Sequence, residues 1–378
     1  MKLPKHKKPK TYNTEAKQEL KLLARLWKLR TFRYPLYALI IVILAPIVFF
    51  VLRRPTIHPN IKYGVNFSDK YARDIGLDWK QTYTAILDDL GAKNLRLVAY
   101  WDDIEATKDT YDFSIIKYQL DEVEKRNATA PEGEQINIIL TVGRKVPRWP
   151  ECFQPTWWHD EELRGQEIQQ LEFVEKTVTE LKNYKSIQMW QVENEPFFTF
   201  GHCNPPIARS ILTREVKVVR ALDNRPIVIQ DSGEGGLWYP TYSLGDYLAI
   251  SMYRKIWFDF WGILLGEFVY FKYPLAHWTY KIKADIVQVP ANKIIVSELQ
   301  AEPWGPVINS ELTEEQKGKT MSRNDFIDTI SYAQKAGFEN IYFWGAEWWY
   351  WEKTQNGNGF YWDTAKALFK ERTISATR

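Results

Sequence analysis

Eight short apolar segments recur along positions 55–378 and alternate with longer segments of helical spacing. A strand buried on both faces reads as an almost continuous apolar run, and strands that alternate with helices form parallel sheets. The length that remains after position 54 suits one barrel of eight βα units. We therefore predict the α/β class, a (β/α)8 TIM barrel over residues 55–378. Its expected strands lie at 61–67, 94–99, 136–142, 189–193, 226–230, 247–252, 293–297 and 340–344.

Two of these strands deliver a glutamate to the same end of the barrel. The segment 190–196 contains Glu195, and the segment 294–298 ends on Glu298, 103 positions later. Catalytic groups of such barrels lie at the carboxyl ends of the strands, and glycoside hydrolysis needs two carboxyl groups. Glu195 would be the acid/base, with a pKa raised by an apolar pocket, and Glu298 the nucleophile. A carboxyl separation of roughly 5 to 5.5 Å would imply retention of configuration. The alternative is that both glutamates are structural partners of arginines.

The motifs around these glutamates resemble those of the clan A glycoside hydrolases, the cellulase and β-galactosidase-like retaining enzymes. Asn194-Glu195-Pro196 is similar to the strand-four motif of the clan, and Ser297-Glu298 is similar to its strand-seven nucleophile segment. The likeness extends over residues 60–370. It implies the barrel fold, the two catalytic roles and a hydrogen bond from Asn194 to the 2-hydroxyl of the sugar.

The same resemblance implies three further site residues. Arg96 matches the strand-two arginine that supports the nucleophile in the clan. Tyr253 matches the strand-six tyrosine that hydrogen-bonds the nucleophile, and Trp344 matches the strand-eight tryptophan on which the sugar lies. The chain departs from the clan where a histidine or Asn-His is common, with Gly-Arg-Lys at 143–145 and Asp-Ser at 231–232. Glu193 and Glu302 compete for the catalytic roles, but Glu193 precedes the rim of the barrel and Glu302 lies past the apolar run of its strand.

Tryptophan is abundant, with 17 residues in the chain, and many follow the expected strands. Aromatic faces stack on the C–H faces of sugar rings. We expect three to five tryptophans to line a glycan cleft, with Trp101 and Trp149 among the substrate-binding residues, while others pack loops against helices. The ten tryptophans that follow strands are Trp101, Trp149, Trp157, Trp158, Trp238, Trp304, Trp344, Trp348, Trp349 and Trp351.

The N-terminal part has a different composition. Residues 1–54 carry thirteen Lys and Arg against two acidic residues, whereas 55–378 hold 37 basic and 45 acidic ones, which excludes a general affinity for nucleic acid. Residues 34–52 lack any charge and would span roughly 28 Å as a helix. We predict a basic cytosolic tail at 1–33, a transmembrane anchor at 34–52 and an extracytoplasmic barrel. A cleaved signal peptide or a buried core helix are the alternatives.

The remaining features are less specific. Cys152 and Cys203 follow neighbouring strands, so they form either a disulfide or two buried thiols. The apolar segment 256–273 contains two acidic residues and is either an interfacial segment that dips into the bilayer or an enlarged helix packed on the barrel. The five histidines lack metal-ligand spacing, and no cofactor is expected.

The prediction as a whole is a membrane-anchored retaining glycosidase that acts on an oligosaccharide, polysaccharide or glycoconjugate. Two other functions use the same fold. One is a non-catalytic glycan-binding or envelope scaffold protein, and the other is a transglycosylase, in which a sugar replaces water as the acceptor.

Overall fold

The computed structural model describes residue 21 and residues 30–52, 57–203, 205–257 and 270–375. The chain divides into two compact units, Met1–Arg54 and Pro55–Arg378, and each is described by itself.

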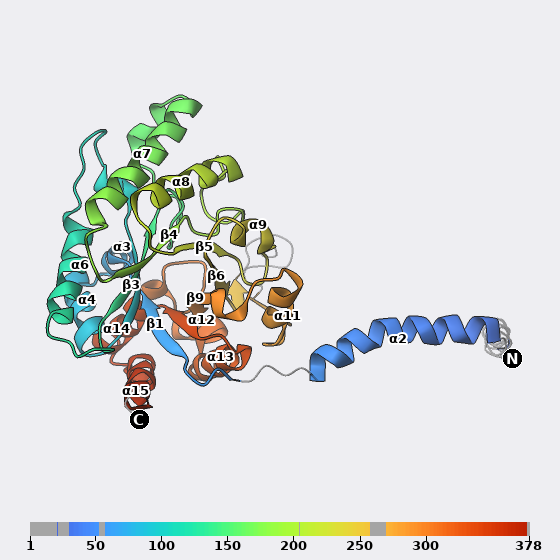
Figure 1. Ribbon diagram of the computed structural model, residues 1–378. Coiled ribbons are helices and arrows are strands. Elements are labelled where there is room, and N and C mark those ends of the chain that lie inside the picture. The colour runs from blue at the N-terminus through green and yellow to red at the C-terminus, as the bar shows by residue number, and fades with distance from the viewer. Residues whose placement is uncertain (1–20, 22–29, 53–56, 204, 258–269, 376–378) are drawn as a thin grey trace, which may run out of the picture. The chain divides into compact units, whose positions relative to one another are not determined.

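The second unit is built on a closed barrel of eight parallel strands, in the order β1-β10-β9-β6-β5-β4-β3-β2 (Figure 1). All eight predicted strands are present, which confirms the (β/α)8 TIM barrel. The strands are β1 Lys62–Asn66, β2 Asn94–Val98, β3 Asn137–Val142, β4 Ile187–Val192, β5 Ile227–Asp231, β6 Tyr247–Met252, β9 Ile294–Gln300 and β10 Asn340–Trp344.

Helices follow the strands and cover the outside of the barrel (Figure 1). Local sequence sets their ends: α13 begins at a capping box of Ser322 and Asp325 and stops at Gly337, which has a left-handed φ of 80°. The α-helices in the described part of this unit are α3 Asp69–Asp74, α4 Trp79–Asp88, α5 Trp101–Ile104, α6 Ser114–Asn127, α7 Leu163–Leu181, α8 Arg209–Leu222, α9 Tyr239–Tyr242, α11 Thr279–Ile286, α12 Glu314–Met321, α13 Arg323–Ala336, α14 Ala346–Thr354 and α15 Phe360–Ser375.

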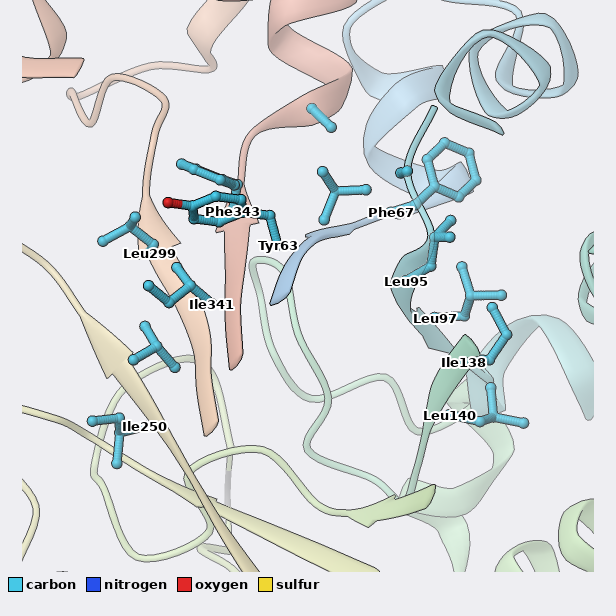
Figure 2. Packing of buried hydrophobic residues seen from close by; sticks show 14 of the residues in the cluster. Tyr63, Phe67, Leu95, Leu97, Ile138, Leu140, Ile250, Leu299, Ile341 and Phe343 are labelled. Carbon is cyan, nitrogen blue, oxygen red and sulfur yellow. The ribbon is translucent and has the colours of Figure 1, made fainter. Parts of the chain in front are cut away.

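The alternation of side chains along the strands sorts apolar residues into two cores. Leu95 and Leu97 of β2 lie beside Ile138 and Leu140 of β3, and they belong to the large cluster between sheet and helices (Figure 2). A smaller cluster includes Ile139, one position from both Ile138 and Leu140, together with Val228, Ala249, Ile295 and Tyr342. Because successive strand residues point to opposite faces, this second cluster fills the interior of the barrel.

Glycine at position 64 of β1 makes room for one of the interior side chains. A Cβ added to Gly64 would lie 2.6 Å from the ring of Tyr342 and 2.6 Å from the carbonyl oxygen of Asn94. The absence of a side chain on β1 therefore lets the tyrosine ring of β10 enter the interior, where it lies in the small cluster.

The predicted transmembrane anchor, 34–52, falls within α2 Arg30–Leu52. In the described part of the chain, no helix combines the length and apolar character needed to cross a membrane, so the structure does not support this prediction. The segment 256–273 is not a helix at its described ends. There β7 Lys255–Trp257 pairs antiparallel with β8 Tyr270–Lys272, and 258–269 lie outside the described residues.

Candidate active site

Glu298 lies at the centre of a hydrogen-bond network at the carboxyl end of the barrel. It stands within β9, which continues to Gln300 rather than ending at residue 297. Its carboxylate accepts bonds from Arg96 Nη1 at 2.7 Å, Gln230 Nε2 at 2.8 Å and the Tyr253 hydroxyl at 3.2 Å. Three donors thus surround a carboxylate that is only 5% exposed. Such donors fix the orientation of the carboxylate, which a nucleophile requires.

Arg96 of β2 is the cation of this network. Its guanidinium is fully buried. It donates to side-chain oxygens of Gln191 at 2.8 Å, Asn66 at 3.0 Å, Glu298 at 2.7 Å, Asn194 at 2.8 Å and Gln230 at 2.5 Å. The five acceptors lie in or directly after four strands, β1, β4, β5 and β9, so the rigid fork of one guanidinium fixes the relative positions of Asn194 and Glu298.

Glu195 follows β4 by three residues, in a turn rather than at the last position of the strand. Its backbone has a positive φ of 43°, an uncommon conformation for a residue with a side chain. The Ser251 hydroxyl donates to Glu195 Oε1 at 2.7 Å, and Ser251 is the register partner of Glu298 across β6 and β9. Burial raises the pKa of Glu195 well above its usual value, and the charges of Glu298 and Glu151 raise it further. A carboxyl that keeps its proton is suited to general acid catalysis.

The loop after β3 contributes a lysine and a third carboxyl group to this region. The buried Lys145 ammonium donates to the carbonyl oxygens of Glu195 at 2.9 Å and Phe198 at 2.8 Å, and it pairs with Glu151 Oε2 at 3.2 Å. Burial raises the pKa of Glu151 to about 7, with Lys145 acting in the opposite direction. The structure joins Cys152 and Cys203 in a disulfide that ties this loop to the one after β4.

The two competing glutamates have structural partners. Glu193 is fully buried and accepts from the backbone amides of Arg144 at 2.8 Å and Lys145 at 2.6 Å. Glu302 pairs with Arg148, whose guanidinium also bonds Glu347. Both glutamates therefore hold the loops around the site.

Arg148 also supports the predicted sugar platform. Its guanidinium lies 4.2 Å from the centre of the Trp344 ring and 3.7 Å from that of Tyr71. Trp344 is 9% exposed, and the guanidinium packed against its ring holds the indole in this mostly buried position.

The predicted aromatic residues divide into two groups. Trp149 is 59% exposed and packs on Phe200, which packs on Trp304, which in turn packs on Tyr253. This row of rings runs from Tyr253, a hydrogen-bond partner of Glu298, to the surface. Trp101 does not fit the expectation of a substrate contact, because α5 begins there and turns its indole into the core. It is 0% exposed, stacks on Phe173 and donates to Glu105. Trp158, Trp238, Trp348 and Trp349 are likewise buried.

Several polar residues of the site escaped the sequence analysis. Gln191, Gln230 and Ser251 are buried polar residues within otherwise apolar strands, a signal that could have indicated them. Asp231, noted as a departure from the clan pattern, accepts from Trp238 N and Thr241 Oγ1 and so holds its own loop. Within the described ranges, no group of side chains has the arrangement of a metal site.

No protein-family model and no curated protein matches the chain by sequence. Solved structures do match. The exo-β-1,4-mannosidase Op5Man5 from Opitutaceae bacterium strain TAV5 superposes with a TM-score of 0.52 at 12% identity, covering 83% of this chain and 60% of that one. A GH5_18 protein from Bifidobacterium longum subsp. longum gives 0.50 at 14% identity, with 75% and 69% covered. A β-galactosidase from Bacillus circulans sp. alkalophilus gives 0.50 at 10% identity, with 76% and 50% covered.

At such low identity these likenesses establish the fold alone. The chain has a (β/α)8 barrel of the kind that glycoside hydrolases use. The resemblance to clan A, drawn from the strand-four and strand-seven motifs, is confirmed at the level of that fold.

Proposed function

We propose that the chain is a retaining glycoside hydrolase, with Glu195 as acid/base and Glu298 as nucleophile. The observation that carries the proposal is the network that links the two. Arg96 binds both Glu298 and Asn194, the neighbour of Glu195, while Ser251 binds Glu195 and is the register partner of Glu298. Double displacement needs two carboxyl groups close to one sugar, and the contacts around Arg96 and Ser251 support such a placement of Glu195 and Glu298.

In this mechanism the two carboxyl groups act in sequence. Glu298 attacks the anomeric carbon while Glu195 transfers its proton to the leaving oxygen, and a glycosyl-enzyme ester forms. Glu195, now ionised, takes a proton from water, which attacks the same carbon and releases Glu298. Asn194, oriented by Arg96 through the bond at 2.8 Å, would donate from its amide nitrogen to the 2-hydroxyl of the sugar.

The proposed substrates are β-linked hexosides, including β-mannosides. One structural neighbour is an exo-β-1,4-mannosidase, and a GH5_18 variant from Bifidobacterium longum subsp. longum, with a TM-score of 0.50 at 13% identity, is a complex with Manβ1-4GlcNAc. These statements concern the neighbours. The row of rings from Tyr253 to Trp149 supports a site for more than one sugar, since each exposed aromatic face can carry one ring.

A panel of aryl β-glycosides and β-1,4-linked disaccharides tests this function. The wild-type chain should hydrolyse at least one β-hexoside, and NMR should show the β-anomer as first product. Glu298→Gln should lose activity by a factor of about 10⁴ or more, by analogy with other nucleophile deletions. Glu311→Gln, which removes an exposed carboxylate, is the matched control and should keep wild-type activity. An active Glu298→Gln variant would exclude the proposed nucleophile.

The same panel separates the two alternatives. A non-catalytic glycan-binding protein would bind oligosaccharides in calorimetry and release no sugar from any of them. A transglycosylase would convert a disaccharide donor into longer oligosaccharides. Hydrolysis to monosaccharides at all acceptor concentrations contradicts both.

We also propose that the segment 34–52 attaches the chain to a bilayer, with the N-terminus in the cytosol and the barrel outside. The support is the uncharged stretch behind eleven basic residues, together with exposed apolar side chains on α2 such as Leu39, Ile41 and Val42. A disulfide in the barrel suits an oxidising compartment. The full chain should remain in the membrane pellet after carbonate extraction, and a Leu39→Lys, Val42→Lys variant should be released. A full chain found only in the supernatant would contradict the attachment.

A further inference from the structure

We propose that Lys145 and Glu151 form a positioning pair that holds the acid/base residue Glu195 in its working conformation. This inference rests on the proposed function. The pair lies on the loop after β3, in the region where the sequence departs from the clan pattern at residues 143–145. Lys145 itself is the last residue of this segment.

The Lys145 ammonium lies beneath the turn that carries the acid/base. It donates to the carbonyl oxygens of both Glu195 and Phe198, and the lysine is only 1% exposed. The same residue holds the turn through its backbone, because its carbonyl oxygen accepts from Asn194 N at 2.6 Å. Side chain and main chain of one residue thus hold the start and the end of the turn 194–198.

The conformation that this lysine stabilises is an unfavourable one. Glu195 has a φ of 43° and Glu193, two residues earlier, a φ of 61°, and neither is a glycine. Left-handed backbone of this kind costs free energy and persists only where surrounding contacts impose it. Without the ammonium, two carbonyl oxygens would lose a charged donor in a buried place, and the turn would relax toward an ordinary φ. The Glu195 carboxyl would then leave the bond to Ser251.

Glu151 supplies the charge that makes a lysine tolerable at this position. An isolated ammonium next to Glu195 would favour the carboxylate form and remove the proton that a general acid must give. The Glu151 carboxylate, 3.2 Å from the ammonium, offsets that effect and raises the pKa of Glu195. Neighbouring residues fix the position of Glu151. Cys152 is bridged to Cys203, and a Cβ on Gly201 would lie 2.8 Å from the Glu151 Cβ.

A pair of substrates with different leaving groups tests the positioning role. A 2,4-dinitrophenyl glycoside needs no proton to depart, whereas a methyl glycoside or disaccharide of the same sugar does. For Lys145→Met, kcat/KM should fall by about 10- to 100-fold on the disaccharide and by less than about threefold on the dinitrophenyl glycoside. The matched control is Lys317→Met, which removes another buried lysine paired with a carboxylate, Glu352, outside the site. It should affect both substrates equally.

Glu151→Gln is the second variant and keeps the carbonyl contacts of Lys145. Since a carboxylate charge is removed while the ammonium stays, the basic limb of kcat/KM on the disaccharide should move to lower pH by about 0.5 to 1 unit. Among the described residues, the charged and titratable groups that face Glu195 are Glu298 from β9, Lys145 and Glu151 from the loop after β3, Tyr253 directly after β6 and Tyr273 directly after β8. If Lys145→Met does not fold, the shift of the basic limb for Glu151→Gln tests the positioning role.

The outcomes separate this inference from the function on which it rests. Equal losses on both substrates for Lys145→Met, or an unmoved basic limb for Glu151→Gln, would overturn the positioning role while an inactive Glu298→Gln variant leaves the hydrolase standing. A wild-type chain that cleaves neither substrate would overturn the proposed function and the inference together.

Discussion

Replacing Arg96 by methionine should destabilise the barrel more than replacing any exposed arginine. The substitution keeps an apolar stem and removes a fully buried cation with five hydrogen bonds. Of the five acceptors, Glu298 matters most, because it alone is a carboxylate. It would keep the donors Gln230 and Tyr253 but lose its counter-charge.

The magnitude follows from that loss. Removing one partner of a buried ion pair costs about 3–5 kcal/mol, since the remaining charge is left without compensation. We expect Arg96→Met to lower the free energy of unfolding by that amount near neutral pH. Part of this loss of stability should disappear when Glu298 is replaced by the neutral glutamine. The double variant Arg96→Met, Glu298→Gln should therefore be more stable than the sum of the two single variants allows, by about 1.5–3 kcal/mol.

Urea unfolding of the wild type, the two single variants and the double variant measures this coupling. Far-UV and near-UV circular dichroism should give coincident transitions if unfolding has two states. Additivity of the two substitutions within about 0.5 kcal/mol would refute the argument, because independent sites behave in that way.

Three other predictions concern the neighbourhood of the site. Tyr253→Phe removes a hydroxyl that donates to Glu298 and should lower kcat/KM about 10- to 100-fold, with an unchanged melting temperature as control for folding. Burial raises the pKa of Glu215 well above its usual value, so the folded state binds this proton more tightly than the unfolded state and loses stability as the pH rises through the folded pKa. Glu215→Gln cannot ionise, so the melting temperature of this variant relative to that of the wild type should rise between pH 5 and pH 9. A difference between the two melting temperatures that is constant with pH would contradict this prediction. Replacing Cys152 and Cys203 by alanine removes a link across 51 positions and should cost about 2–4 kcal/mol in unfolding experiments, whereas a loss below about 0.5 kcal/mol would show that the link contributes little.

Most of the fold could be predicted because barrel strands are buried on both faces. The runs at 136–142 and 247–252 contain few polar residues, and the structure has strands at both places. The end of β9 was less predictable. Glu298 and Gln300 belong to the strand, but polar residues at a strand end look like a loop in sequence. Gln300 accepts from the backbone amides of Arg254 and Lys255, a contact 45 or more positions away that no local pattern indicates.

The candidate site could be predicted where a motif spans neighbouring positions. Asn194 and Glu195 stand together in the chain, and the structure ties both into the network around Arg96 and Ser251. Gln230 lies 68 positions from its partner Glu298, so sequence spacing says nothing of their contact. The burial of Trp101 depends on the packing of α5 against Phe173, which also follows from tertiary structure alone.

Mechanism-based labelling tests the central claim most directly. A 2-deoxy-2-fluoro glycoside of the sugar that the wild type hydrolyses should trap the glycosyl-enzyme, and mass spectrometry of peptides should locate it. We predict one sugar per chain, esterified to Glu298. A sugar on Glu193 or Glu302, or complete hydrolysis with inverted configuration and no trapped ester, would contradict the assignment.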